Sequence, residues 1–353
     1  MKKRKLIIVL AISMILSSCS KKVKLESFKN TFYGTFDTVI TYLAFEENEK
    51  NFEKNYEFVE KEYQRLHKLY DRYNSYEGVV NVKTINENAG IKPVKVEKDL
   101  FDIIKFSIDN YDKTKGKVNI AMGSVLEIWH KYRLQNEGLK ENETRIPKKE
   151  ELLEANKNVD INNIVLDEKN MEVYIKDPKL SIDLGSVAKG YATELIAKKL
   201  VERGVKHAII NAGGNVRVIG KPGDDRKTWK IALQNPDLNS SDPLDILSIN
   251  DKSVVTSGDY QRYFIHKGRN YHHIIDPITL EPGGEFSSIS IVVKDSGIAD
   301  LLSTAVYLSS KEEALEIIKN YEDVGVVWYS MNSGKDNTEN LDEYLESKNS
   351  KIK

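Results

Sequence analysis

The sequence predicts an α+β fold in which most strands are antiparallel. Two stretches, at about residues 49–73 and 99–112, carry apolar residues at spacings of three and four, which is the period of an amphipathic helix. After a later helix at 186–201, the chain holds a series of short β-rich runs separated by turn residues. Long helices interleaved with mostly antiparallel strands are typical of an α+β fold.

The first half of the chain begins with an alternating segment, residues 31–45, that predicts one strand. The helix at 49–73 follows, and the helix at 99–112 is succeeded by a third at 126–132. Residues 135–160 are dense in Lys, Glu and Asn, which predicts an exposed insertion. The first helix has an apolar stripe that we interpret as a core face: Phe52, Tyr56, Val59, Tyr63, Leu66 and Tyr70.

The second half contains most of the predicted strands. A hairpin is expected at 164–166 and 172–175, and the helix at 186–201 ends near Gly204, a residue suited to a left-handed cap. Further helices are expected at 298–308 and 311–320. Strands are predicted at 208–210, 216–219, 229–233, 253–256, 263–266, 271–275, 288–293 and 324–329. The polar tail at 331–353 is expected to fray, apart from a short helix at 341–345.

The N-terminal segment predicts export and a lipid anchor. Residues 1–5 are basic and residues 6–16 are apolar, which is typical of a secretory signal and too short to span a bilayer. The run ends in Leu16-Ser17-Ser18-Cys19, a pattern typical of a bacterial lipobox, and Cys19 is the chain's single cysteine. We expect residues 1–18 to be a signal peptide, Cys19 to carry the lipid, and 19–30 to be a tether at the extracytoplasmic face of the cell membrane. An ordinary signal peptide that contains a cysteine is the alternative.

The composition predicts a folded body without affinity for nucleic acid. Hydrophobic residues make up 40% of the chain, charged residues 30%, and the net charge is −1. This apolar fraction supports a sizeable core. Acidic and basic residues are interspersed, so there is no basic patch of the kind that binds nucleic acid.

A strand, a glycine-bearing turn and a helix follow one another at residues 181–190 (SIDLGSVAKG). Asp183 and Lys189 lie on either side of the turn. The start of a helix exposes backbone N–H groups and favours anions. A tight strand-to-helix connection with a surface salt bridge explains the same residues equally well.

Asp300 and Thr304 are four residues apart on a predicted helix, so they share one face. A carboxylate and a hydroxyl without His or Cys form a hard oxygen site, which suits Mg²⁺, or Mn²⁺ with its similar ligands. The alternative is structural: Asp300 would interact with the helix N-terminus and Thr304 would hydrogen bond to the Asp300 carbonyl.

Further polar and glycine-rich clusters occur at residues 211–215, 256–260, 272–277 and 299–305. Together with 181–190, and in this order, they resemble the ApbE family of flavin transferases. The resemblance covers about residues 32–329 and implies a two-lobed, T-fold-like domain at 31–330 with FAD held between the lobes. It implies Mg²⁺-dependent transfer of FMN from FAD to a threonine or serine hydroxyl of an acceptor, with release of AMP. Acceptors would be FMN-binding domains of membrane redox complexes.

The resemblance also implies roles for individual residues. The Ser186 carbonyl, Asp300 and Thr304 would bind the metal, and Lys189 would lie near the flavin phosphates. The residues implied in FAD binding are Tyr73, Ala121, Met122, Gly123, Asp183 and Ile274, with Tyr73 stacking on the flavin. The chain departs from the family pattern at three positions: Tyr33 replaces a Met, Ala121 a Thr, and Ser186 a Gly.

His273 is a candidate general base for the acceptor hydroxyl, because an imidazole accepts a proton near neutral pH. It could equally orient Asp276 or its loop. Asp276-Pro277 predicts a turn, and the Asp276 carboxylate is a candidate for the catalytic set. Because the nucleophile is not in this chain, a metal-dependent FAD pyrophosphatase and a non-catalytic flavin-binding lipoprotein stay open. A substrate-binding lipoprotein of a transporter would share the anchor but would not need Asp300 and Thr304.

Overall fold

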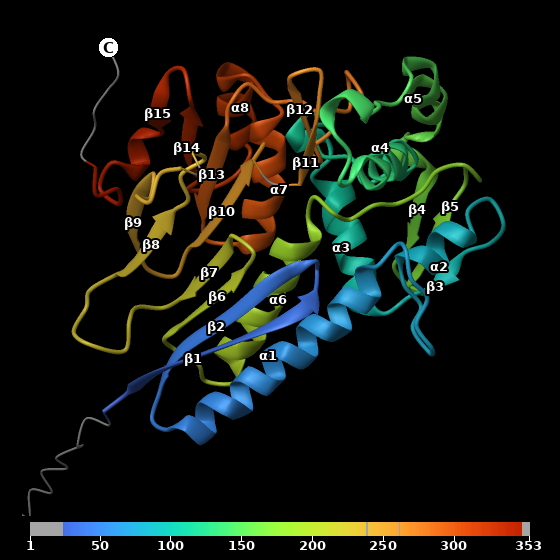
Figure 1. Ribbon diagram of the computed structural model, residues 1–353. Coiled ribbons are helices and arrows are strands. Elements are labelled where there is room, and N and C mark those ends of the chain that lie inside the picture. The colour runs from blue at the N-terminus through green and yellow to red at the C-terminus, as the bar shows by residue number, and fades with distance from the viewer. Residues whose placement is uncertain (1–23, 238, 261, 348–353) are drawn as a thin grey trace, which may run out of the picture.

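The computed structural model describes residues 24–237, 239–260 and 262–347 (Figure 1). Its centre is one eight-stranded sheet in which every pair of neighbours is antiparallel. In spatial order the strands are β1 (Glu26–Thr35), β2 (Thr38–Glu46), β6 (Ala208–Ala212), β7 (Asn215–Ile219), β10 (Ser253–Gly258), β13 (Ser288–Val293), β14 (Gly325–Ser330) and β15 (Gly334–Asn337). The predicted α+β class with mostly antiparallel strands is confirmed.

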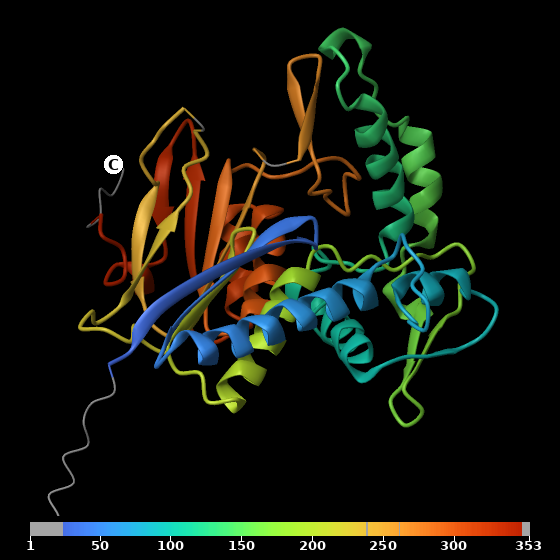
Figure 2. The same ribbon diagram turned by 60° about the horizontal axis from the view of Figure 1, so that its bottom comes forward.

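Four helices lie along one face of this sheet and enclose the main core (Figures 1 and 2). They are α1 (Glu49–Tyr70), α6 (Ala188–Glu202), α7 (Ser296–Tyr307) and α8 (Lys311–Ile318). The side chain of Asn48 caps α1 by accepting the Asn51 N–H. The predicted apolar stripe of α1 is buried except at Tyr56, which is half-buried. The α1 helix ends at Tyr70, and its C-terminal end points towards the second part of the molecule (Figure 2).

A second group of elements lies beside the end of the large sheet (Figure 2). It contains α2 (Val82–Glu87), α3 (Lys98–Asp109), α4 (Gly123–Asn136), α5 (Lys149–Ala155) and a small sheet of β3 (Val94–Lys95), β5 (Glu172–Ile175) and β4 (Ile164–Asp167). Short 3₁₀ turns occur at η1 (Asp112–Thr114), η2 (Glu141–Glu143), η3 (Asn156–Asn158) and η4 (Ile161–Asn163). The hairpin of β11 (Tyr263–His266) and β12 (Arg269–His272) packs on α4 through a separate hydrophobic cluster that contains Trp129 and Tyr271.

The N-terminal strand prediction is wrong in one respect, because residues 31–45 form parts of two strands. Phe36 and Asp37 have positive φ values of 51° and 50°, and they turn the chain back between β1 and β2. Pairing begins at Glu26, opposite Glu46. Residues 26–30, which the sequence assigned to the tether, therefore belong to the sheet. The signal peptide and Cys19 lie outside the described residues.

The C-terminal tail is also ordered further than expected, because residues up to 347 pack on the body. Strand β15 extends the large sheet, and the 3₁₀ turn η5 (Glu339–Leu341) follows it. Leu341 and Leu345 are buried against β8 (Trp229–Leu233) and β9 (Asp245–Ile249), a ribbon whose second strand was not predicted. In the insertion at 135–160, the short α5 buries Leu152. None of the described helices is both long and apolar enough to cross a membrane.

Candidate active site

A cavity of about 760 Å³ lies where the large sheet meets the second group of elements. Its walls come from the β1–β2 turn, the residues after α1, the start of α4, the turn before α6, the end of β10, and the loop after β12. Nine of the residues predicted for the site line it: Tyr73, Met122, Asp183, Ser186, Lys189, His273, Ile274, Asp300 and Thr304. Segments far apart in the sequence therefore converge on one hollow.

Asp183 is held firmly at the turn before α6. One carboxylate oxygen, Oδ1, accepts the Gly185 N–H at 2.7 Å, and Oδ2 accepts Nη1 of Arg72 at 2.7 Å. The Arg72 side chain is only 6% exposed. Arg72 also donates to the carbonyl of Gly123 at 3.1 Å, so it ties the starts of α4 and α6 together. Arg72 was not predicted, although it directly precedes Tyr73 in the sequence.

The crossing of α6 and α7 places Asp300 against the start of α6. Its Oδ2 accepts the backbone N–H of Gly190 at 2.7 Å. Burial raises the pKa of the Asp300 carboxyl, while the Lys189 charge, the Gly190 N–H and the Asn215 amide act in the opposite direction. A buried carboxylate of this kind is stabilised by a nearby cation.

Thr304 follows Asp300 by one turn of α7 and is half-buried in the same cavity. Its hydroxyl has no hydrogen-bond partner among the described residues. Ser303, not Thr304, donates to the Asp300 carbonyl, at 2.8 Å, and the N-cap of α7 is Asp295. The structural alternative is therefore wrong on both points: Asp300 is not at the helix N-terminus, and the Thr304 hydroxyl does not bond to the Asp300 carbonyl.

The donor set fits a hard cation. Asp300 and Thr304 offer a carboxylate and a hydroxyl to which no described residue hydrogen bonds, and Ser186 lines the same cavity. The described residues contain no group of three or more His, Cys, Asp or Glu side chains arranged around a common point. The site would therefore supply few protein charges and leave the remaining positions to water and substrate oxygens, as Mg²⁺ sites commonly do.

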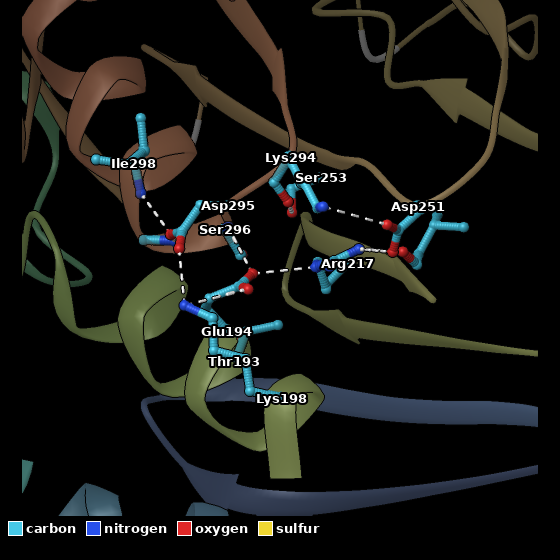
Figure 3. Close-up of polar contacts among 12 residues, drawn as sticks. Thr193, Glu194, Lys198, Arg217, Asp251, Ser253, Lys294, Asp295, Ser296 and Ile298 are labelled. Atoms are coloured by element: carbon cyan, nitrogen blue, oxygen red, sulfur yellow. Dashed lines mark hydrogen bonds and ion pairs between the residues drawn. The ribbon is translucent and has the colours of Figure 1, made fainter. Parts of the chain in front are cut away.

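A network of buried charges holds this crossing in place (Figure 3). Glu194 of α6 accepts Nε of Arg217 at 3.0 Å and the Ser296 N–H at the start of α7 at 2.9 Å. The Glu194 and Arg217 side chains are 7% and 6% exposed. Arg217 of β7 also contacts Asp251 at 3.2 Å. The network fixes α7, and hence Asp300, relative to α6 and the sheet.

His273 faces the cavity from the loop after β12. Burial, and then the positive charges of Lys189, Arg262, His272 and Arg133, lower its pKa to about 3. Its Nδ1 is shielded from solvent and has no hydrogen-bond partner among the described residues. His273 is therefore a neutral imidazole with a ring nitrogen that a ligand can engage.

Asp276 does not line the cavity. Its Oδ1 accepts the backbone N–H groups of Ile278 and Thr279 at 2.7 and 2.9 Å, which confirms the predicted turn. Its Oδ2 lies 3.4 Å from Nζ of Lys117. Through these contacts Asp276 shapes its own loop and pairs with Lys117, which lines the cavity.

The remaining predicted binding residues divide into two groups. Tyr73 is 47% exposed at the cavity edge, and its ring contacts that of His130 in a tilted arrangement, with 5.0 Å between the ring centroids. Ala121 and Gly123 are buried and do not line the cavity, whereas Met122 between them does. The Gly123 N–H donates to Ser181 at 2.9 Å. Cys19 lies outside the described residues.

The chain thus has a mixed α+β fold with a cavity lined by charged and polar side chains beside the crossing of α6 and α7. The chain belongs to the ApbE family, whose model matches residues 34–328. An FAD:protein FMN transferase of Klebsiella pneumoniae (strain 342) is 29% identical over 252 residues, which are 71% of this chain and 75% of that protein. An FAD:protein FMN transferase of Haemophilus influenzae is 26% identical over 323 residues, which are 88% of each chain.

Solved structures of the family share the fold. The crystal structure of the ApbE protein from Thermotoga maritima superposes with a TM-score of 0.75 at 27% identity, over 90% of this chain and 99% of that chain. The flavin transferase ApbE from Vibrio cholerae superposes with a TM-score of 0.75 at 20% identity, over 91% of this chain and 100% of that chain. The second likeness supports the fold alone.

Proposed function

We propose that this protein is an FAD:protein FMN transferase. It would move FMN from FAD to a threonine or serine hydroxyl of an acceptor protein and release AMP. The observation that carries the proposal is the convergence of Lys189, His273 and Asp300 on one cavity in a chain of the ApbE family. A phosphoryl transfer needs cations for the phosphates and a group that accepts the hydroxyl proton. Lys189 is such a cation, Asp300 is a carboxylate that would hold a metal cation, and His273 is of the type that accepts a proton.

FAD would lie in the cavity between the large sheet and the second group of elements. A volume of about 760 Å³ falls within the usual range of about 300–1,000 Å³ for ligand pockets. Tyr73 and Ile274 offer aromatic and apolar surface for the flavin. Lys189 has no ion-pair partner among the described residues, so its ammonium is available for the pyrophosphate.

Mg²⁺, or Mn²⁺, would be held by Asp300 and Thr304 together with the Ser186 carbonyl. Such an ion supplies positive charge for the pyrophosphate oxygens and for the charge that develops on the leaving AMP. The support for it is the chemistry of the donor set: a buried carboxylate with a raised pKa and a hydroxyl that has no hydrogen-bond partner in the described part of the chain. The Gly190 N–H orients the carboxylate.

In the transfer step, the acceptor hydroxyl oxygen attacks the phosphorus on the FMN side of the pyrophosphate. A bond forms between this oxygen and the phosphorus, and the bond from the phosphorus to the bridging oxygen breaks. AMP leaves with the bridging oxygen. His273 would take the hydroxyl proton; the support is that its imidazole is neutral, and the bound pyrophosphate would offset the positive charges that lower its pKa.

We place the protein at the extracytoplasmic face of the cell membrane, held by a lipid on Cys19. The support is the basic, apolar and Leu16-Ser17-Ser18-Cys19 sequence of residues 1–19. FMN-binding domains of membrane redox complexes would be the acceptors, since a short tether at the membrane keeps the enzyme close to them.

The proposal is tested by measuring AMP release from FAD and Mg²⁺ by chromatography, with and without an FMN-binding acceptor domain. A transferase releases AMP only when the acceptor is present. AMP and free FMN in equal amounts without an acceptor would instead identify a pyrophosphatase, in which water replaces the hydroxyl. Bound, intact FAD under both conditions would identify a flavin-binding protein without turnover.

A further inference from the structure

Arg133 is a cation of the cavity wall that the proposed chemistry does not use. It lies on α4, is half-buried and lines the cavity. Its Nη2 lies 2.8 Å from Nδ1 of His130, whose ring contacts that of Tyr73. Among the described residues, no carboxylate forms an ion pair with Arg133.

A second arginine, Arg262, comes to the same cavity from the start of β11. Its Nη2 donates to the backbone carbonyl of Asp37 at 2.8 Å, in the β1–β2 turn. The Asp37 carboxylate is 3.9 Å from Nη1 of Arg262 and is 85% exposed. A pair this long and this exposed is weak, so Asp37 leaves most of the Arg262 charge uncompensated.

The two arginines line the same cavity, and their like charges act on one another. Burial, and then the charge of Arg262, lower the pKa of Arg133. Both arginines also act on His273, as does Lys189. Like charges gathered on one partly buried wall are unfavourable unless an anion binds between them.

We propose that Arg133 and Arg262 form a second anion subsite of the cavity, separate from Lys189, that binds an anionic group of the substrate pair. A guanidinium presents two parallel N–H groups that match the oxygens of a phosphate or a carboxylate. Arg133 lies on α4 and Arg262 directly precedes β11, whereas Lys189 belongs to α6. This inference rests on the proposed function, since it assigns the subsite to a substrate of that reaction.

Two sources could supply the anion. One is the phosphate of FAD on the AMP side. The other is a carboxylate beside the hydroxyl of the acceptor, which would then dock at the rim of the cavity. Both have the same recognition chemistry, so separate binding measurements must distinguish them.

The test uses the soluble body of the protein with Arg133→Gln, Arg262→Gln and the double substitution. In the presence of Mg²⁺, the dissociation constant of FAD is measured by flavin fluorescence. The dissociation constant of an FMN-binding acceptor domain is measured by surface plasmon resonance. Arg133→Lys and Arg262→Lys retain the charge and should recover part of the affinity. Arg226→Gln is the matched control, because Arg226 pairs with Asp224 and does not line the cavity.

We expect one dissociation constant to rise about tenfold or more in the double variant, as expected for charge-assisted hydrogen bonds. A rise for FAD alone assigns the subsite to the AMP-side phosphate, and a rise for the acceptor alone assigns it to an acceptor carboxylate. A change below about twofold in both constants, like that of the Arg226 control, would overturn the inference. Arg262→Gln keeps the test valid if Arg133→Gln unfolds, since Arg262 is 48% exposed.

Binding constants do not depend on turnover, so the subsite and the proposed transferase function can be refuted independently. A protein that binds FAD through Arg133 and Arg262 but transfers nothing would contradict the proposed function and leave the subsite in place. A protein that transfers FMN, and whose dissociation constants are unchanged in the double variant, would contradict the subsite and leave the proposed function in place.

Discussion

Gly190 donates its backbone N–H to the buried carboxylate of Asp300 across 2.7 Å. The hydrogen bond joins the start of α6 to the middle of α7, and it links two sequence clusters that are 110 residues apart. A Cβ atom at Gly190 would lie 2.3 Å from both Cβ of Asp300 and the Ser296 carbonyl oxygen. The close approach of the two helices therefore needs a glycine here, and the orientation of Asp300 depends on it.

Gly190→Ala should lower the free energy of unfolding by about 1–3 kcal/mol, because the added methyl overpacks the crossing. It should also weaken Mg²⁺ binding, since Asp300 has to move. Urea unfolding and titration calorimetry measure the two effects. Val201→Ala is the control, because Val201 lies on the same helix and is 52% exposed. Equal stability of the two variants would contradict the close crossing.

Asp300→Asn should reduce the affinity for Mg²⁺ by about tenfold or more, because it removes the charged oxygen ligand. Calorimetric titration with Mg²⁺ measures the change without any need for turnover. Asp295→Asn is the matched control on α7: it keeps an N-cap oxygen for the Gly297 and Ile298 N–H groups and lies outside the cavity. Unchanged Mg²⁺ affinity in Asp300→Asn would exclude Asp300 as a ligand.

Glu194→Gln should cost about 3 kcal/mol in the free energy of unfolding, because it leaves the buried Arg217 without its main counter-charge (Figure 3). Glu57→Gln should cost less than about 1 kcal/mol, since its pair with Lys61 spans 3.7 Å with both side chains more than half exposed. Urea denaturation of both variants provides the comparison. Equal losses would show that the Glu194 network does not stabilise the helix crossing.

The pH dependence of the free energy of unfolding should reveal the lowered pKa values of the two adjacent histidines, His272 and His273. Burial is the main cause that lowers the pKa of His273 to about 3 and that of His272 to about 4. The unfolded chain protonates each near 6.5, so unfolding takes up protons at acidic pH. Their stabilisation is complete above pH 6.5 and is lost as the pH falls towards 4 and 3.

His273→Gln should therefore lose less stability than the wild type between about pH 7 and pH 5. The difference should be about 2 kcal/mol, which is the linkage expected for one such histidine over this interval. Urea unfolding at the two pH values measures it. The same loss in both proteins would show that His273 titrates normally in the folded state.

The fold class and most elements could be predicted because they depend on local periodicity. The stripe of α1 and the hairpin of β4 and β5 are visible in the sequence. The strands β9 and β15 were missed: β15 (GKDN) contains no apolar residue, and β9 (DILSI) is only five residues long. The turn at Phe36 and Asp37 was missed because non-glycine residues adopt positive φ there, which the sequence does not signal.

The candidate site was predicted where a motif itself carries chemistry, as with Lys189 or Asp300. Arg72, Arg133 and Arg262 were missed, because an arginine is exposed in most contexts and only tertiary packing shows that these line a cavity. Asp276 was assigned to the catalytic set from its motif, yet its carboxylate binds the turn that follows it. Sequence position alone does not distinguish a loop-shaping carboxylate from one that meets a ligand.

The most direct test of the account is the intact mass of an FMN-binding acceptor domain after incubation with the soluble body, FAD and Mg²⁺. We expect a gain of one FMN on a threonine or serine, one AMP released for each adduct, and neither product with Asp300→Asn. An unmodified acceptor that the protein demonstrably binds, with FAD left intact or cleaved to free FMN, would contradict the assignment as a transferase.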